Sequence, residues 1–99
     1  MYGTVARLCI TPGAFDKFAH LVQEFTTLNV PGFVTTYLYQ LDANPNECYM
    51  AVIFRDKATY DANAQSAAQN ERYQQMRALL TSDPEWHDGT ASAFVNPAR

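Results

Sequence analysis

Residues 47–54 have the sequence ECYMAVIF, an apolar run with the length of a single β-strand. Successive side chains of a strand point to opposite faces of the sheet. One face would carry Cys48, Met50, Val52 and Phe54, and the other would carry Tyr49, Ala51 and Ile53. Because both sets are mostly apolar, the sheet that contains this strand must be covered on both faces.

Three further segments are predicted to be strands, because they are rich in β-branched and aromatic residues or are bounded by turn residues. These segments are residues 2–10, 33–41 and 90–95. The turn cluster DANPN at 42–46 would join the strand before it to the strand after it in an antiparallel hairpin.

A first helix is predicted between Phe15 and Leu28, where apolar residues recur at helical spacing. Pro31 cannot continue a helix and restricts the residue before it to extended angles, while Gly32 permits a turn. The helix should therefore end before the sequence NVPG at 29–32.

A second helical region follows residue 56 and is predicted to be broken in two. Asp56 can cap a short helix around 57–64, and Ser66 with Gln69 forms a capping box for another helix. The break therefore falls at Gln65 and Ser66.

The order strand, helix, strand, strand, helix, strand predicts an α+β fold of the ferredoxin-like, split β-α-β type. In that fold a four-stranded antiparallel sheet has its helices on one face. The chain length suits a single domain over residues 1–99. Since the helices cover only one face, we expect the sheet of a second copy to cover the other, which gives a homodimer.

Composition and charge exclude several classes of protein. The formal charge is -3 and the seven Lys and Arg residues form no run, so no nucleic-acid partner is expected. No segment approaches the ~20 apolar residues of a membrane-spanning helix, and the N-terminus lacks the pattern of a signal peptide. We therefore expect a cytoplasmic protein with no membrane partner. Cys9 and Cys48 show no metal or redox spacing and are predicted to be small buried thiols.

Several short motifs add to this order of elements. They are PGF at 31–33, which opens the second strand, AVIF at 51–54, which ends the third, and YDANA at 60–64, which opens the broken helix. With these motifs the chain resembles, over residues 2–95, the antibiotic-biosynthesis monooxygenase family of dimeric α/β-barrel proteins. That family shares one architecture and includes several activities.

The haem-degrading branch of that family is not matched. It uses an Asn on the first strand, a Trp on the second helical region and a haem-ligating His farther along that region. The corresponding positions here hold Ala6, Asn63 and Tyr73. The resemblance therefore implies no haem.

A second branch, the cofactor-independent, quinone-forming monooxygenases of aromatic polyketide pathways, is matched in part. Its pocket carries an Asn, a Trp and a Tyr on the broken helix and a polar residue near the last strand. Asn63 and Tyr73 match in type and spacing, Ala67 replaces the Trp, and His87 lies near the last-strand position.

The resemblance implies a monooxygenase that uses neither cofactor nor metal, because a deprotonated phenol or anthrone itself reduces dioxygen. Asn63 would polarise the substrate oxygen, and Tyr73 and His87 would transfer protons. A small aromatic substrate would also contact Ala67, Met76 and Trp86.

Each proposed catalytic residue also has a structural explanation. Asn63 lies near a helix end and can cap backbone groups, and Tyr73 leads an apolar stripe that fits a core position. His87 belongs to WHDG at 86–89, which can form a solvated turn. The alternatives to an oxygenase are therefore a non-catalytic binding protein for a small hydrophobic ligand and a purely structural dimer.

Overall fold

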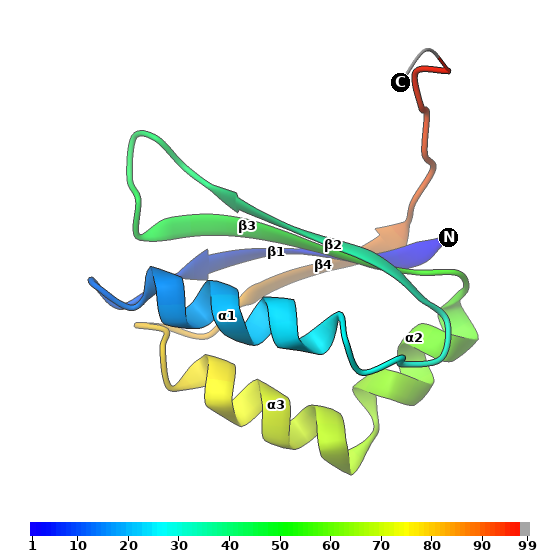
Figure 1. The fold of residues 1–99 in the computed structure, drawn as a ribbon, viewed down its shortest axis with the longest axis horizontal. Helices are drawn as coiled ribbons and strands as arrows, with labels where there is room; N and C mark the ends of the chain where they lie inside the picture. The colour runs from blue at the N-terminus through cyan, green and yellow to red at the C-terminus, as the bar shows by residue number, and fades with distance from the viewer. Residues whose placement is uncertain (98–99) are drawn as a thin grey trace.

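The structure, a computed structural model, describes residues 1–97 and places three helices against one face of a four-stranded sheet (Figure 1). The elements in chain order are β1 (Tyr2–Cys9), α1 (Phe15–Phe25), β2 (Phe33–Gln40), β3 (Glu47–Phe54), α2 (Lys57–Ala64), α3 (Ala67–Arg77) and β4 (Glu85–Thr90). The spatial order of the strands is β2-β3-β1-β4, with antiparallel pairing throughout. The predicted ferredoxin-like fold is confirmed.

The end of α1 shows how the chain turns back into the sheet. The helix stops at Phe25, and Asn29 and Gly32 then take positive φ values of 53° and 79°. Gly32 adopts this left-handed conformation without strain because it has no Cβ. The predicted helix stop at NVPG is confirmed.

The predicted break of the second helical region is also confirmed, and Asp56 and Ser66 cap the two helices. The Gln69 half of the predicted capping box does not form, because Gln69 Oε1 accepts from Arg72 and the Ser66 backbone N–H donates to the Asn63 backbone carbonyl. The Asp56 carboxylate accepts a hydrogen bond from the backbone N–H of Thr59 at the start of α2. The Ser66 hydroxyl accepts one from the backbone N–H of Gln69 at the start of α3. Each cap satisfies a backbone donor that a helix start leaves without an intrahelical partner. The second cap therefore stabilises an additional helix start, which an uninterrupted helix would not need.

The core lies on the inner face of the sheet, which is the face that the helices cover. Its buried residues come from β1 and β3, from the residue after β1, from α1 and from the segment after α3, and they are Ala6, Leu8, Ile10, Phe18, Cys48, Met50 and Leu80. Ile10 and Leu80 form an isolated β-bridge that ties the end of β1 to the end of the α3 segment. Burial of these apolar side chains supplies most of the driving force for folding.

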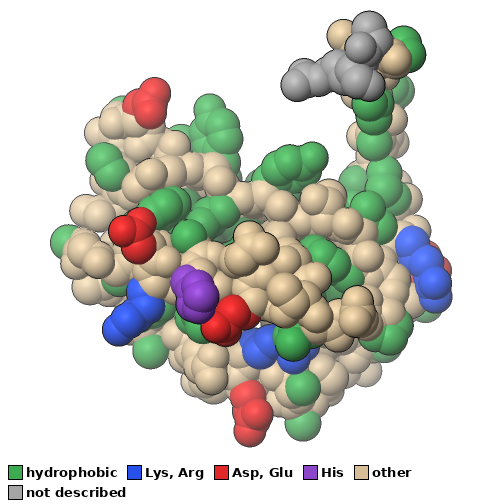
Figure 2. All heavy atoms as spheres, in the orientation of Figure 1, with side chains coloured by type: hydrophobic (Ala, Val, Ile, Leu, Met, Phe, Trp, Pro, Cys, Tyr) green, Lys and Arg blue, Asp and Glu red, His purple; other side chains and the backbone are tan. Residues whose placement is uncertain are grey.

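The outer face of the sheet, which no helix covers, is rich in apolar side chains. Strand pairing aligns Tyr37, Ala51, Val5 and His87 in one row, and Tyr39, Tyr49, Arg7 and Glu85 in the next. Tyr37 and Tyr39 are 67% and 66% exposed. Hydrophobic side chains protrude from the upper edge of the body in Figure 2, on the side away from the helices. The sheet therefore has two apolar faces, as the composition of residues 47–54 predicts.

The last strand is not where the sequence predicts it. We expected residues 90–95, TASAFV, but β4 is Glu85–Thr90 and includes the WHDG segment that was considered as a turn. The reason is register: Arg7 pairs with Glu85 and Tyr2 with Thr90, so β1 has no residues left to pair with the segment beyond. Backbone pairing with β1 outweighs the higher β-propensity of the later segment.

Residues 91–97 continue beyond the sheet as an extended segment (Figures 1 and 2). The backbone N–H of Ala91 still donates to the carbonyl of Met1. Beyond that bond Phe94 and Val95 are 96% and 79% exposed.

The two cysteines lie on opposite faces of the sheet. Cys48 is a buried free thiol in the core, and burial raises its pKa. Cys9 is also free but lies on the outer face and is only partly buried, so the prediction of two buried thiols is correct for Cys48 alone. Within residues 1–97, no helix is both long and apolar enough to cross a membrane.

The paired glycines Gly3 and Gly89 provide a test of how closely β1 and β3 approach. A Cβ on Gly3 would overlap the carbonyl oxygen of Val52, whereas a Cβ on Gly89 would meet no atom within 4 Å. We expect Gly3→Ala to lower the free energy of unfolding by about 2 to 3 kcal/mol, because backbone atoms must shift. Gly89→Ala should change it by less than about 0.5 kcal/mol. Urea unfolding followed by circular dichroism measures both, and equal losses would contradict the close approach.

Candidate functional site

A cavity of about 360 Å³ lies between the inner face of the sheet and the helices. Its volume falls within the ~300 to 1,000 Å³ range typical of sites for small molecules. The apolar walls include Leu21, Val22 and Phe25 on α1 and Met50, Val52 and Phe54 on β3. These side chains offer a flat hydrophobic ligand a mostly apolar environment.

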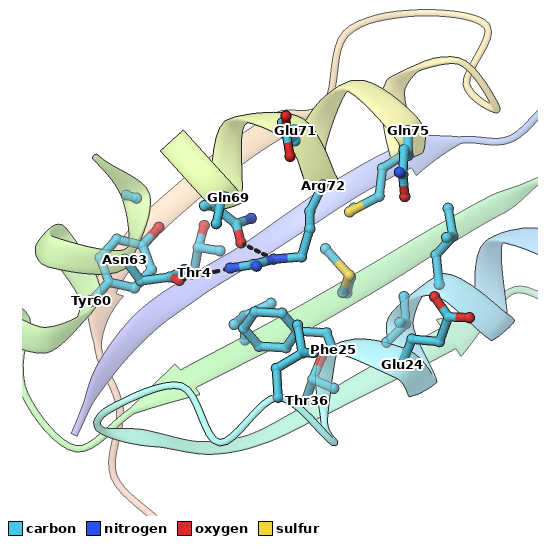
Figure 3. Close-up of a pocket in the computed structure, with 18 of the residues that line it drawn as sticks. Thr4, Glu24, Phe25, Thr36, Tyr60, Asn63, Gln69, Glu71, Arg72 and Gln75 are labelled. Atoms are coloured by element: carbon cyan, nitrogen blue, oxygen red, sulfur yellow. Dashed lines mark hydrogen bonds between the residues drawn. The ribbon is translucent and has the colours of Figure 1, made fainter. Parts of the chain in front are cut away.

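One end of the cavity is polar, and side chains from β1, α2 and α3 meet there (Figure 3). Arg72 reaches back from α3 toward α2, where its Nη2 donates to Asn63 Oδ1 at 3.3 Å. Its Nε donates to Gln69 Oε1 at 3.0 Å, and its guanidinium carbon lies 5.3 Å from the centre of the Phe25 ring. Two amide oxygens and one aromatic face thus hold the guanidinium in place.

The bond with Arg72 determines how Asn63 is presented. Because Oδ1 accepts from the guanidinium, the Nδ2 amide group is the part of Asn63 left to donate to a ligand. The structure gives Nδ2 no acceptor among residues 1–97. Asn63 therefore adds an oriented hydrogen-bond donor to the polar end.

Thr4 and Tyr60 complete the polar end. Thr4 is 4% exposed, and its buried Oγ1 has no hydrogen-bond partner in the described part of the chain. The Tyr60 hydroxyl donates to Asp88 Oδ1 at 3.0 Å. Burial, followed by the hydrogen bond to Asp88 and its charge, raises the pKa of Tyr60 to about 12, although the nearby Thr4 hydroxyl acts in the opposite direction. At neutral pH the cavity thus contains a neutral phenol bonded to a carboxylate.

Three of the residues predicted to form the site do line the cavity. Asn63 lies at the polar end, and Met76 from α3 and Trp86 from β4 contribute to the apolar wall. Trp86 faces the cavity because it pairs with Ala6, an inner-face residue of β1.

The other three predicted residues lie outside the lining. The Tyr73 ring packs against Trp86, with 6.3 Å between ring centres, and so lies behind the wall. Ala67 is exposed in the first turn of α3, and the neighbouring Ala68 is the residue that lines the cavity. His87 pairs with Val5 on the outer face of the sheet, where its Nε2 lies 2.8 Å from Glu85 Oε1.

Sequence analysis missed Thr4, Tyr60 and Arg72. Tyr60 opens the YDANA motif and was available as a candidate, but nothing in the sequence indicated that it would meet Asp88 across the sheet edge. Arg72 lies nine positions after Asn63, and their contact depends on the angle between α2 and α3. Within residues 1–97, no group of three His, Cys, Asp or Glu side chains could hold a metal ion.

The raised pKa of Tyr60 makes stability depend on pH in the alkaline range. Because the pKa in the folded protein lies above the ordinary value of 10, the resulting stability is fully present below about pH 10 and is lost as the pH rises through about 12. We expect the free energy of unfolding of Tyr60→Phe to change less with pH over this range than that of the unmodified protein. Urea unfolding at a series of pH values measures this, with the exposed Tyr37→Phe as the control. Parallel curves for the protein and Tyr60→Phe would contradict the assignment.

Comparison with known proteins bears on the fold and on the family. The crystal structure of SnoaB, a cofactor-independent oxygenase from Streptomyces nogalater, is 20% identical with a TM-score of 0.77, and 95% of each chain is covered. A conserved protein from Methanosarcina mazei Go1 is also 20% identical, with a TM-score of 0.77 and 92% of each chain covered. Similarity at these identities concerns the fold.

No curated protein matches the chain. Residues 1–79, by contrast, match the model of the family described as antibiotic biosynthesis monooxygenase. Because this match spans most of the chain, the protein belongs to the antibiotic biosynthesis monooxygenase family.

Proposed function

We propose that the protein is a cofactor-independent monooxygenase that oxidises a small phenolic, anthrone or quinol-like compound with dioxygen. The observation that carries the proposal is the position of Asn63, which presents a free amide donor at the polar end of an otherwise apolar cavity. Family membership supports an oxygenase, and SnoaB, which shares the fold, is a cofactor-independent oxygenase.

The reaction needs only the substrate as reductant. Loss of a proton gives a conjugate anion, which transfers electrons to dioxygen and forms a peroxide. For an anthrone, the CH₂ group and O₂ become a C=O group and water when that peroxide collapses, so the atoms and electrons balance. The Asn63 Nδ2 group would donate to the oxygen on which negative charge develops, which is the kind of interaction that lowers such barriers most.

A proton must leave the substrate, and Tyr60 is placed to take it. Tyr60 is a lining residue of the cavity, and its hydroxyl already donates to Asp88, an exposed carboxylate of β4. Tyr60 would accept the substrate proton as it passes its own to Asp88, and the proton would then reach solvent. Tyr73 would act by holding Trp86 in the wall.

Dioxygen uptake tests the role of Asn63. With an anthrone or hydroquinone, uptake by the protein should exceed the spontaneous rate. We expect Asn63→Ala to lower the enzymatic rate by ~10-fold to 100-fold, the scale for loss of one polarising group. An oxygen electrode measures the rates under matched conditions.

Asn70→Ala is the matched control, because Asn70 is an exposed residue of α3 outside the cavity lining. Equal rates for Asn63→Ala and Asn70→Ala would remove the proposed role. A ligand that raises the melting temperature without any oxygen consumption would instead favour the non-catalytic binding protein.

We also propose that a second copy of the chain covers the outer face of the sheet. Val5, Tyr37, Tyr39 and Tyr49 form a contiguous, exposed and largely uncharged surface there. A symmetric dimer would bury these side chains against the same residues of the partner.

Sedimentation tests the dimer. At micromolar concentration the protein should sediment as a dimer, and Tyr39→Glu should shift it toward the monomer, because the change would bury like charges at the interface. Gln74→Glu, which adds the same charge to an exposed position on α3, should leave the dimer intact. A monomer for the unmodified protein would overturn the proposal.

A further inference from the structure

Arg72 differs from the other arginines in the described part of the chain. Arg7, Arg55 and Arg77 each lie within salt-bridge distance of a carboxylate, namely Glu47, Asp56 and Asp83. Arg72 has no such partner among residues 1–97, and the oxygens that accept its hydrogen bonds belong to the neutral amides of Gln69 and Asn63. It carries a positive charge with no counter-charge in contact.

The position of Arg72 makes the missing counter-charge costly. The side chain is partly buried, with the guanidinium at the polar end of the cavity (Figure 3). Partial burial removes water from the charge, and neutral amides compensate less well than a carboxylate does. A guanidinium has five N–H donors, and the protein accepts from only two of its nitrogens here. The remaining donors can reach a ligand.

The two carboxylates in the cavity lining do not supply the missing charge. Glu71 is exposed and points away from Arg72 on the far side of α3 (Figure 3). Glu24 is exposed on α1, and its Oε1 lies 2.9 Å from His20 Nε2. The chain as a whole carries a formal charge of -3, so long-range attraction does not draw anions to it. Any preference for an anion must arise locally.

We propose that the ligand of this cavity is a flat apolar molecule with an anionic oxygen group, and that Arg72 binds that group beside the Asn63 amide donor. The inference rests on the proposed function, because it takes the cavity to be the site where the ligand binds. A guanidinium suits a planar oxyanion because two parallel N–H groups can meet two oxygens. The apolar walls would hold the ring system, and the charge would lie at the polar end.

The test compares two probes of nearly equal shape, 2-naphthoate and the neutral 2-naphthamide. We expect the protein to bind 2-naphthoate ~10-fold to 100-fold more tightly, the scale of a charge-assisted hydrogen bond in a partly buried site. Isothermal titration calorimetry at neutral pH measures both. Equal affinities, or tighter binding of the amide, would rule out a carboxylate as the anionic group.

Variants at Arg72 locate the preference. Arg72→Gln should remove most of the preference for 2-naphthoate and leave the affinity for 2-naphthamide nearly unchanged. Arg72→Lys should retain part of it, because the charge remains while the planar fork is lost. Arg55→Gln removes one positive charge from an exposed pair and is the matched control. A full preference in Arg72→Gln would overturn the role of Arg72, and so would an equal loss of both probes.

The anionic group can be a carboxylate or the phenolate of a bound phenol, and pH distinguishes the two sources. Affinity for 2-naphthoate should stay constant between about pH 6 and pH 9, since a carboxylate is ionised throughout. Affinity for 2-naphthol should rise with pH if the site takes a phenolate. Selective binding of either anion over its neutral form, lost in Arg72→Gln, supports the proposal, and no selectivity for either overturns it.

Neither probe set requires turnover. If naphthoate binds selectively and no substrate consumes dioxygen, the anion site stands and the oxygenase proposal fails. If dioxygen is consumed with no preference for an anion, the oxygenase proposal stands and the role of Arg72 fails.

Discussion

The pairing of β1 with both β3 and β4 is the interaction on which the rest of the structure depends. β1 lies between these strands, and its side chains alternate between the two faces of the sheet. Ala6 and Leu8 point into the core, and Val5 and Arg7 point to the outer face. The same register assigns Trp86 to the cavity and His87 to the opposite side. Because the side-chain period of a strand is two, a shift of one residue would exchange these faces.

The candidate site depends equally on the break between α2 and α3. In one straight helix, Asn63 and Arg72 would lie on separate turns, and both side chains would project from the same helix axis. The cap at Ser66 allows a change of direction, and the guanidinium then donates to Asn63 Oδ1 across the break. A local capping preference thus places an amide and a positive charge at one end of an apolar cavity.

The sequence predicts what local rules control and fails where pairing or long side chains decide. Asp56 and Ser66 cap the helices where expected, because a cap is determined by residues within one turn. The last strand was predicted too late in the chain, because residues 85–90 are mostly polar and exposed and show little strand pattern. Their place in the sheet is determined by pairing with the free edge of β1. That error also obscured the alternation that separates Trp86 from His87. Arg72 and Tyr60 could not be assigned, because each contact is made by a long side chain and depends on how two elements are oriented in space.

One feature of α3 bears on how a ligand would enter the cavity. α3 contributes wall residues such as Met76, yet none of its own side chains is fully buried. The free energy needed to open a segment follows the apolar area that it buries, so α3 is held more weakly than the strands beneath it. The Arg72–Asn63 hydrogen bond connects α3 to α2, and the Tyr73–Trp86 contact connects it to β4. Both contacts must break before α3 can move away from the cavity. The residues that form the site would then also set the rate at which it admits and releases its occupant.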